Sequence, residues 1–154
     1  MNFTDTHTHL YLEEFNTDRD KVIEKALASG VSRMFLPNID SSSIPGLFAL
    51  VKQYPGCCYP MMGLHPCSVN ANYEQELSIA EYWLQKKNTA GSADKFYAVG
   101  EIGIDLFWDK TFFIQQQDAF RRQIKFAKQY DLPIVIHSRN SFNEVYEIVK
   151  EMND

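Results

Sequence analysis

Cysteine is scarce in this sequence, and the three cysteines present are poorly placed for cross-links. Their number is odd, Cys57 and Cys58 are adjacent, and no C-x-x-C pair occurs that would hold a structural zinc ion. We therefore expect free thiols in a reducing compartment.

Long apolar runs are also lacking. No run approaches the roughly 20 residues that a membrane-spanning helix needs. The N-terminal MNFTDTHTHL has neither the basic start nor the apolar centre of a secretion signal. We expect a cytoplasmic protein without membrane association.

Positive charge is in short supply as well. The chain has 15 lysines and arginines against 20 aspartates and glutamates, so its net charge is −5. This balance argues against a protein that grips a polyanion through a broad basic surface. A nucleic-acid partner would have to be held locally, by cations within a site.

Glycine and proline number only seven and six, and neither forms a linker. Hydrophobic residues make up 45% of the 154 positions, which is enough to bury a core. We therefore expect residues 1–154 to form a single domain.

Short apolar runs alternate with amphipathic stretches along the whole chain, with centres roughly 25 to 40 residues apart, the length of a strand plus a crossover helix. The predicted strands are Phe3 to Asp5, Met34 to Pro37, Tyr59 to Leu64, Tyr97 to Gly100 and Ile134 to Ile136. The polar stretch Asn88 to Lys95 is predicted to be a solvated loop. The pattern indicates five βα units.

The amphipathic stretches carry helix signals. Thr17 followed by Asp20 resembles a capping box before the first helix, and Ser141 with Glu144 resembles one before the last. In that last helix Phe142, Val145 and Val149 are predicted to face inward. The inner face of the fourth helix is predicted to carry Phe113, Gln117, Phe120, Ile124 and Ala127.

Two α/β architectures fit five βα units: a doubly wound open sheet, or the first five units of a (β/α)₈ barrel. Strand counting favours the open sheet, because a complete barrel needs about 250 residues. The placement of the polar residues favours the barrel.

All four histidines of the chain fall at or just after the end of a predicted strand: His7 and His9 after the first, His65 after the third and His137 after the fifth. Glu101 follows the fourth. In βα folds the carboxyl ends of the strands form the face on which sites are built.

The spacing adds chemistry. His7 and His9 stand two residues apart, so on a strand their side chains leave on one face and can reach one ion. Asp5 has the same parity and is a candidate to orient an imidazole. Glu101 offers a carboxylate that can bridge two ions, and His137 offers a further nitrogen. Such ligands suit zinc, manganese or magnesium.

Each of these residues has a plainer interpretation when taken alone. An isolated H-x-H is a weak signal, Glu101 could be a surface carboxylate, and His137 could belong to a turn before a helix. Taken together they predict a metal site. Ligands drawn from the first, fourth and fifth strands converge more readily in a barrel than along the edge of an open sheet.

Four motifs in this order resemble the TatD family of deoxyribonucleases. They are Asp5-Thr6-His7-Thr8-His9-Leu10, Gly63-Leu64-His65-Pro66, Gly100-Glu101-Ile102-Gly103-Ile104-Asp105 and His137-Ser138-Arg139. The resemblance runs from the first strand to the last helix. It implies a TIM-barrel hydrolase that uses two divalent metal ions to cleave phosphodiester bonds of DNA, with single-stranded DNA as the expected substrate.

The resemblance also implies a role for each site residue. His7 and His9 match ligands of the first metal ion, Glu101 matches the carboxylate shared between the ions, and His137 matches a ligand of the second. His65 matches a pocket histidine that contacts the scissile phosphate or positions water. Arg139 is a candidate phosphate contact, since a guanidinium suits bidentate binding.

The chain is shorter than the family pattern, which adds a histidine after a sixth strand and an aspartate after an eighth. We expect either a fragment of a longer protein or half-barrels that associate. Two alternatives to the nuclease stay open: an amidohydrolase-class enzyme acting on a small amide or ester, and an inactive fragment with a partial metal site.

Overall fold

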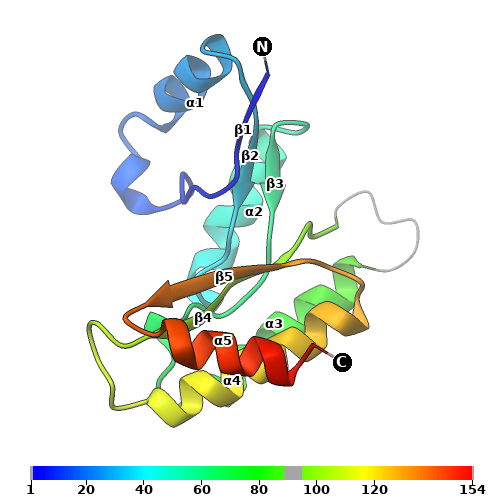
Figure 1. The fold of residues 1–154 in the computed structure, drawn as a ribbon. Helices are drawn as coiled ribbons and strands as arrows, with labels where there is room; N and C mark the ends of the chain where they lie inside the picture. The colour runs from blue at the N-terminus through cyan, green and yellow to red at the C-terminus, as the bar shows by residue number, and fades with distance from the viewer. Residues whose placement is uncertain (1, 89–94, 154) are drawn as a thin grey trace.

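Five strands alternate with five α-helices in the computed structural model, which describes residues 2–88 and 95–153. The strands are β1 (Phe3–Asp5), β2 (Val31–Leu36), β3 (Cys58–Pro60), β4 (Val99–Asp105) and β5 (Ile134–Arg139). The helices are α1 (Arg19–Ala28), α2 (Ile44–Gln53), α3 (Tyr73–Lys87), α4 (Phe113–Gln129) and α5 (Phe142–Glu151) (Figure 1). Three short 3₁₀ turns are η1 (Glu13–Phe15), η2 (Ser41–Ser43) and η3 (Pro66–Ser68). The predicted α/β alternation is confirmed.

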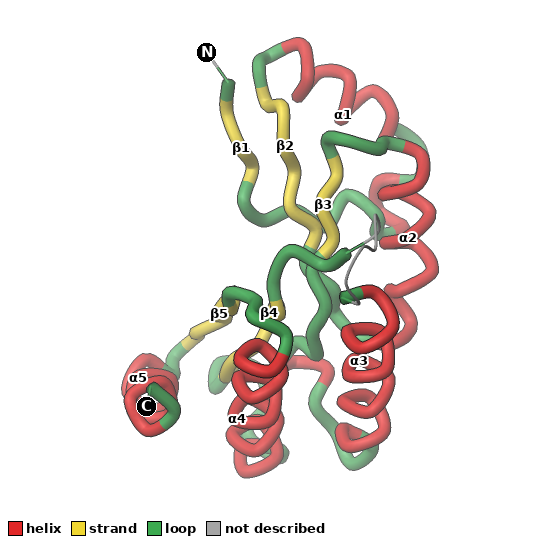
Figure 2. Tube along the Cα trace, turned by 90° about the vertical axis from the view of Figure 1, so that its right-hand side faces the viewer, coloured by secondary structure: helices red, strands yellow, loops and turns green. Residues whose placement is uncertain are grey.

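All the strand pairs are parallel. β1 pairs with β2 and β2 with β3, while β4 pairs with β5. A single bridge between Met62 and Val99 joins the two groups. The strands follow one curve, and the helices lie along its outer side (Figure 2). Because the strands are parallel, their carboxyl ends lie together at one end of the curved sheet.

The apolar residues form two clusters rather than one. The first cluster lies between β2, β3, α1, α2 and the segment after β1, and its buried members include Ile23, Met34 and Leu47. The second lies between β4 and helices α3, α4 and α5, and includes Leu77 and Phe120. Each cluster buries the inner face of its helices, which is the main driving force for packing them on the strands.

Helix α4 confirms most of its predicted inner face but shifts one polar position. Gln116 and Gln123 are buried, whereas Gln117 is only half-buried. Gln116 bonds both the amide and the carbonyl of Asp105, at 2.9 and 3.2 Å. Gln123 does the same for Leu64, at 2.7 and 3.2 Å. These side chains satisfy backbone groups that the ends of the strands would otherwise leave unpaired.

Both predicted capping boxes are wrong. Helix α1 begins at Arg19 after Asp18, and no side chain caps it. The hydroxyl of Ser141 does not cap α5 but donates to the carbonyl of Ile104 at 2.6 Å, so it fastens α5 to β4. At Ser141 a tertiary contact therefore replaces the local signal.

The inward position predicted for Phe142 is also wrong, since 74% of its surface is exposed. Val145 and Ile148 form the buried face of α5, and Val149 is partly buried against it. Phe142 instead stacks on Tyr146 at 6.3 Å, on the outer side of the helix.

Strand β4 is longer than predicted. It continues past Gly100 to Asp105, and all seven of its residues are buried. Glu101 therefore lies inside the strand rather than after it. His137 likewise lies within β5, which extends to Arg139.

No helix among the described residues is long and apolar enough to cross a membrane. The predicted loop from Asn88 to Lys95 lies mostly outside the described residues, at positions 89–94.

Candidate metal centre

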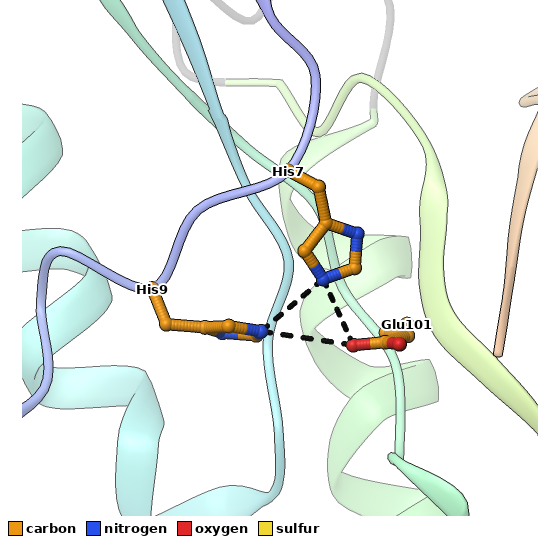
Figure 3. A group of neighbouring side chains, drawn as sticks. All are labelled: His7, His9 and Glu101. Carbon is orange, nitrogen blue, oxygen red and sulfur yellow. Dashed lines mark hydrogen bonds and ion pairs between the residues drawn. The ribbon is translucent and has the colours of Figure 1, made fainter. Parts of the chain in front are cut away.

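His7 and His9 lie just after β1, where the backbone continues to follow β2. The amide of Thr8 donates to the carbonyl of Phe35 at 3.0 Å, so the residues on either side of Thr8 turn the same way. Their Nε2 atoms are 3.2 Å apart. Figure 3 shows both rings directed at the carboxylate of Glu101.

These three side chains have the spacing of ligands around one ion. Glu101 Oε2 lies 3.0 Å from His7 Nε2 and 3.6 Å from His9 Nε2. Ligands that bind one zinc-sized ion tetrahedrally at about 2.05 Å stand roughly 3.3 Å from one another. The donor set of two imidazoles and a carboxylate therefore fits a divalent ion.

The ring of His9 is oriented by a tyrosine. Its Nδ1 lies 2.9 Å from the hydroxyl of Tyr11, and that hydroxyl donates to the carbonyl of Pro37. Because the tyrosine proton is used on Pro37, the hydroxyl oxygen accepts from His9 Nδ1–H. The lone pair of His9 is then on Nε2, the atom that faces Glu101.

The other oxygen of Glu101 faces a third imidazole, that of His137. Glu101 Oε1 lies 2.8 Å from His137 Nδ1, and His137 Nε2 lies 2.9 Å from Asp105 Oδ2. Glu101 and Asp105 share a face of β4 because they are four residues apart, and Asp105 is paired with Arg139 across to β5. An imidazole held between two carboxylates resembles the carboxylate–histidine–metal arrangement of metal sites.

His65 joins this group in a different way. It stands at the start of η3, and its Nδ1 accepts from the amide of Cys67 at 3.0 Å. Its Nε2 lies 3.6 Å from Glu101 Oε2. Burial lowers the pKa of His65 to about 4, so the ring is neutral at pH 7. A neutral ring that accepts on Nδ1 carries its proton on Nε2, and His65 therefore offers a donor to the site rather than a lone pair.

The charges of the centre support one another. Burial of Glu101 would raise the pKa of its carboxyl, but the hydrogen bond with His137 holds that pKa well below its usual range. The hydrogen bond to Glu101 raises the pKa of His137. Burial opposes the ionisation of Asp105, yet the amide of Phe107 and the ring of His137 keep its pKa lowered. Glu101 and Asp105 are therefore anionic at neutral pH, as ligands for a cation must be.

Arg139 is placed apart from these residues. Its guanidinium carbon lies 4.0 Å from the ring centre of Phe107 and 5.1 Å from that of Trp108. Arg139 is the last residue of β5, and its guanidinium lies over the loop that follows β4, at the rim of the centre.

The structure brings His7, His9, His65, Glu101 and His137 together, and their metal-binding and catalytic roles stay predictions. The role proposed for Asp5 is wrong, since its carboxylate accepts from the backbone amide of His7 at 3.1 Å and bonds no imidazole.

Two residues of the centre were missed from the sequence: Asp105, which bonds His137, and Tyr11, which bonds His9. A spacing visible in the sequence could have found both. Tyr11 stands two residues after His9, as His9 does after His7, and Asp105 stands four residues after Glu101 on the same strand.

Comparison with known proteins identifies the family. Residues 4–154 match the family described as TatD related DNase. The chain belongs to the TatD family. Among TatD relatives, the uncharacterized metal-dependent hydrolase YabD of Bacillus subtilis is 35% identical over 147 residues, which cover 96% of this chain and 54% of YabD.

Two further TatD relatives extend the comparison. The crystal structure of YjjV, a TatD homologue from Escherichia coli K12, superposes with a TM-score of 0.81 at 32% identity and covers 98% of this chain and 56% of that one. The 3'-5' ssDNA/RNA exonuclease TatD of Erwinia tasmaniensis is 30% identical over 146 residues, covering 95% of this chain and 54% of that protein. The chain thus spans about half the length of the TatD relatives it matches.

Proposed function

We propose that this chain carries the metal-binding residues of a nuclease that hydrolyses phosphodiester bonds of single-stranded DNA with two divalent ions. One observation carries the proposal: the carboxylate of Glu101 stands between two sets of imidazoles. Its Oε2 faces His7 and His9, and its Oε1 faces His137. A carboxylate with donors on both sides is suited to bridge two ions.

Two bound ions would lower the pKa of a water molecule and neutralise the phosphate oxygens. The protein's own residues would prepare the site for the substrate. Glu101, His7, His9 and His137 would hold the ions, with zinc, manganese and magnesium all compatible with these donors. His65, with its proton on Nε2, would donate to an oxygen of the scissile phosphate.

The same ions would resolve the problem of charge. The chain has a net charge of −5, so its surface as a whole repels nucleic acid. Two divalent ions bring about four positive charges to one point, where they outweigh the more distant acidic residues. The name of the Erwinia relative, an exonuclease for single-stranded DNA and RNA, supports a nucleic-acid substrate.

We propose further that the five βα units are the first five of a (β/α)₈ barrel forming a single domain. The curved row of strands, with helices on its outer side only, supports this (Figure 2). So does the match to a TatD structure of nearly twice the length.

Cleavage of labelled single-stranded DNA with Mg²⁺ or Mn²⁺ tests the nuclease. We expect metal-dependent cleavage by the parent chain, with Glu101→Gln and His7→Ala each lowering the rate at least about 100-fold because they remove ligands. Glu74→Gln, an exposed change on α3, is the matched control and should keep the parent rate. Turnover of a small ester or amide without cleavage of DNA would instead support an amidohydrolase-class enzyme.

A further inference from the structure

Two large aromatic side chains stand exposed beside the metal centre. On the loop after β4, 49% of Phe107 and 71% of Trp108 are accessible to solvent. Their rings meet edge to face at 4.7 Å, and the guanidinium of Arg139 lies over Phe107. We call Phe107, Trp108 and Arg139 the aromatic rim.

The rim is held in place by its backbone. Asp105 Oδ1 accepts from the amides of Phe107 and Trp108 at 2.9 and 3.3 Å. The amide of Leu106 donates to the carbonyl of Arg139 at 2.9 Å, which ties the loop to β5. The rings are therefore exposed on a fixed support, an arrangement that lowers the entropy cost of binding a ligand.

A single carboxylate connects the rim to the metal centre. While Asp105 Oδ1 holds the loop, its Oδ2 accepts from His137 Nε2 at 2.9 Å. The ring of His137 in turn contacts Glu101. A phosphate bound by metal ions at Glu101 would thus place the base of an adjoining nucleotide within reach of the rim.

The shape of the rim selects its outer face for binding. The cleft on the inner side of Trp108, which Pro66 and Phe112 also line, has a volume of about 60 Å³. It has room for a few water molecules but not for a base. A base would therefore bind outside this cleft, and the exposed indole of Trp108 offers a surface on which it can stack.

We propose that the aromatic rim is the subsite for the bases of single-stranded DNA, with one base stacked on Trp108 and a phosphate bound by Arg139. Stacking on aromatic rings beside a cation is how proteins hold single strands without reading their sequence. A flat guanidinium supported by Phe107 is also suited to bidentate contact with phosphate. This inference rests on the proposed function, because it names how that site would hold its substrate.

Tryptophan fluorescence tests the rim independently of catalysis. The chain has two tryptophans, Trp83 and Trp108, so Trp83→Phe leaves the indole of the rim as the sole one. With Mg²⁺ present, we expect a phosphorothioate oligothymidylate, which resists cleavage, to quench this variant, and an abasic phosphorothioate oligonucleotide of equal length and charge to quench it far less. Trp108→Phe should show no quenching.

Affinity gives the second readout. We expect Trp108→Ala to weaken binding of labelled oligothymidylate about tenfold, as loss of one stacked base would, and to leave binding of the abasic strand unchanged. Tyr82→Ala is the matched control, because Tyr82 is an exposed aromatic ring on α3 away from the centre. It should bind both strands as the parent does.

The rim and the nuclease can fail separately. Equal quenching by the two oligonucleotides, quenching that persists in Trp108→Phe, or no quenching in Trp83→Phe overturns the rim even where DNA is cleaved. If the parent shows no metal-dependent cleavage but base-dependent quenching at Trp108 persists, the proposed nuclease activity is overturned and the base-binding subsite stands.

Discussion

At the scale of single residues, the hydrogen bond that Nδ1 makes decides whether Nε2 of His9 or His65 carries a lone pair or a proton. His9 donates through Nδ1 to Tyr11 and keeps a lone pair on Nε2, whereas His65 accepts through Nδ1 from the amide of Cys67 and keeps a proton on Nε2. Both rings face Glu101 through Nε2. They are therefore prepared for opposite tasks, His9 to bind a cation and His65 to donate to an anion.

Tyr11→Phe should weaken metal binding about tenfold, because the ring of His9 loses the acceptor that fixes its tautomer. Burial raises the pKa of Tyr11, so its hydroxyl keeps its proton for Pro37 and its oxygen for His9 at neutral pH. Calorimetric titration of the metal-free proteins with Mn²⁺ or Zn²⁺ measures the change in metal affinity.

Two controls accompany this variant. Tyr73→Phe removes a hydroxyl that bonds Asp118, away from the centre, and should leave affinity unaltered. His65→Gln should also retain the metal, since His65 presents a proton rather than a lone pair. An affinity for Tyr11→Phe equal to that of the parent would show that the tyrosine does not orient the ligand.

At the scale of elements, the order of strands and helices was predictable because each helix buries an apolar face of period 3.6. The ends were not. The predicted β4 stopped at Gly100 because the glycines and carboxylates that follow resemble a loop, yet the chain from Glu101 to Asp105 is buried beside β5 and Gln116. Phe142 follows the helical period of α5, but its side chain is exposed, because Val145 and Ile148 form the buried face of that helix.

The candidate site was predictable to a similar degree. Histidines at strand ends and a carboxylate on the same face indicated the convergence of His7, His9 and Glu101 that the structure shows. The parts that escaped prediction depend on distant partners: Tyr11 needs the carbonyl of Pro37, and Asp105 needs β5 in register. The alternation in the sequence marks the positions of Tyr11 and Asp105, but it does not identify these distant partners.

Gly103→Ala should destabilise the protein by about 3 kcal/mol, because it strains β4 in two ways. Gly103 has a φ of 146°, which side chains disfavour, and a methyl group there would run into the carbonyl of His137. The β4–β5 register would shift and carry His137 away from Glu101. Chemical denaturation measures the loss, and metal titration should show weakened binding.

Gly56→Ala separates the effect of the positive φ from that of the steric contact. Gly56 also has a positive φ, 86°, but an added methyl group there would meet nothing within 4 Å. It should cost only about 1 kcal/mol and leave metal affinity intact. Equal costs for the two variants would mean that the contact with β5 does not constrain position 103.

At the scale of the whole molecule, the metal centre lies where two packed halves meet. One apolar cluster joins the segment after β1 to β2, β3, α1 and α2, and the other joins β4 to α3, α4 and α5. His7 and His9 come from the first half, and Glu101 and His137 come from the second. An ion bound by all four would cross-link the halves at the carboxyl ends of their strands.

Saturating Mn²⁺ or Zn²⁺ should therefore stabilise the entire chain, because the ion binds the folded state far better than separated ligands. At 100 times the dissociation constant the gain is about 2.7 kcal/mol. That gain raises the melting temperature of a chain this size by roughly 5 to 10 °C. EDTA should reverse the rise, and His7→Ala should reduce it.

Hydrogen exchange shows whether the ion joins the halves or binds to only one of them. If ligands from both halves hold it, metal should slow exchange of amides in β1 and β2 as well as in β4 and β5. Protection confined to β4 and β5 would mean that Glu101 and His137 hold the ion alone. In that case His7 and His9 would be pocket residues rather than ligands, and Glu101 would not bridge two ions.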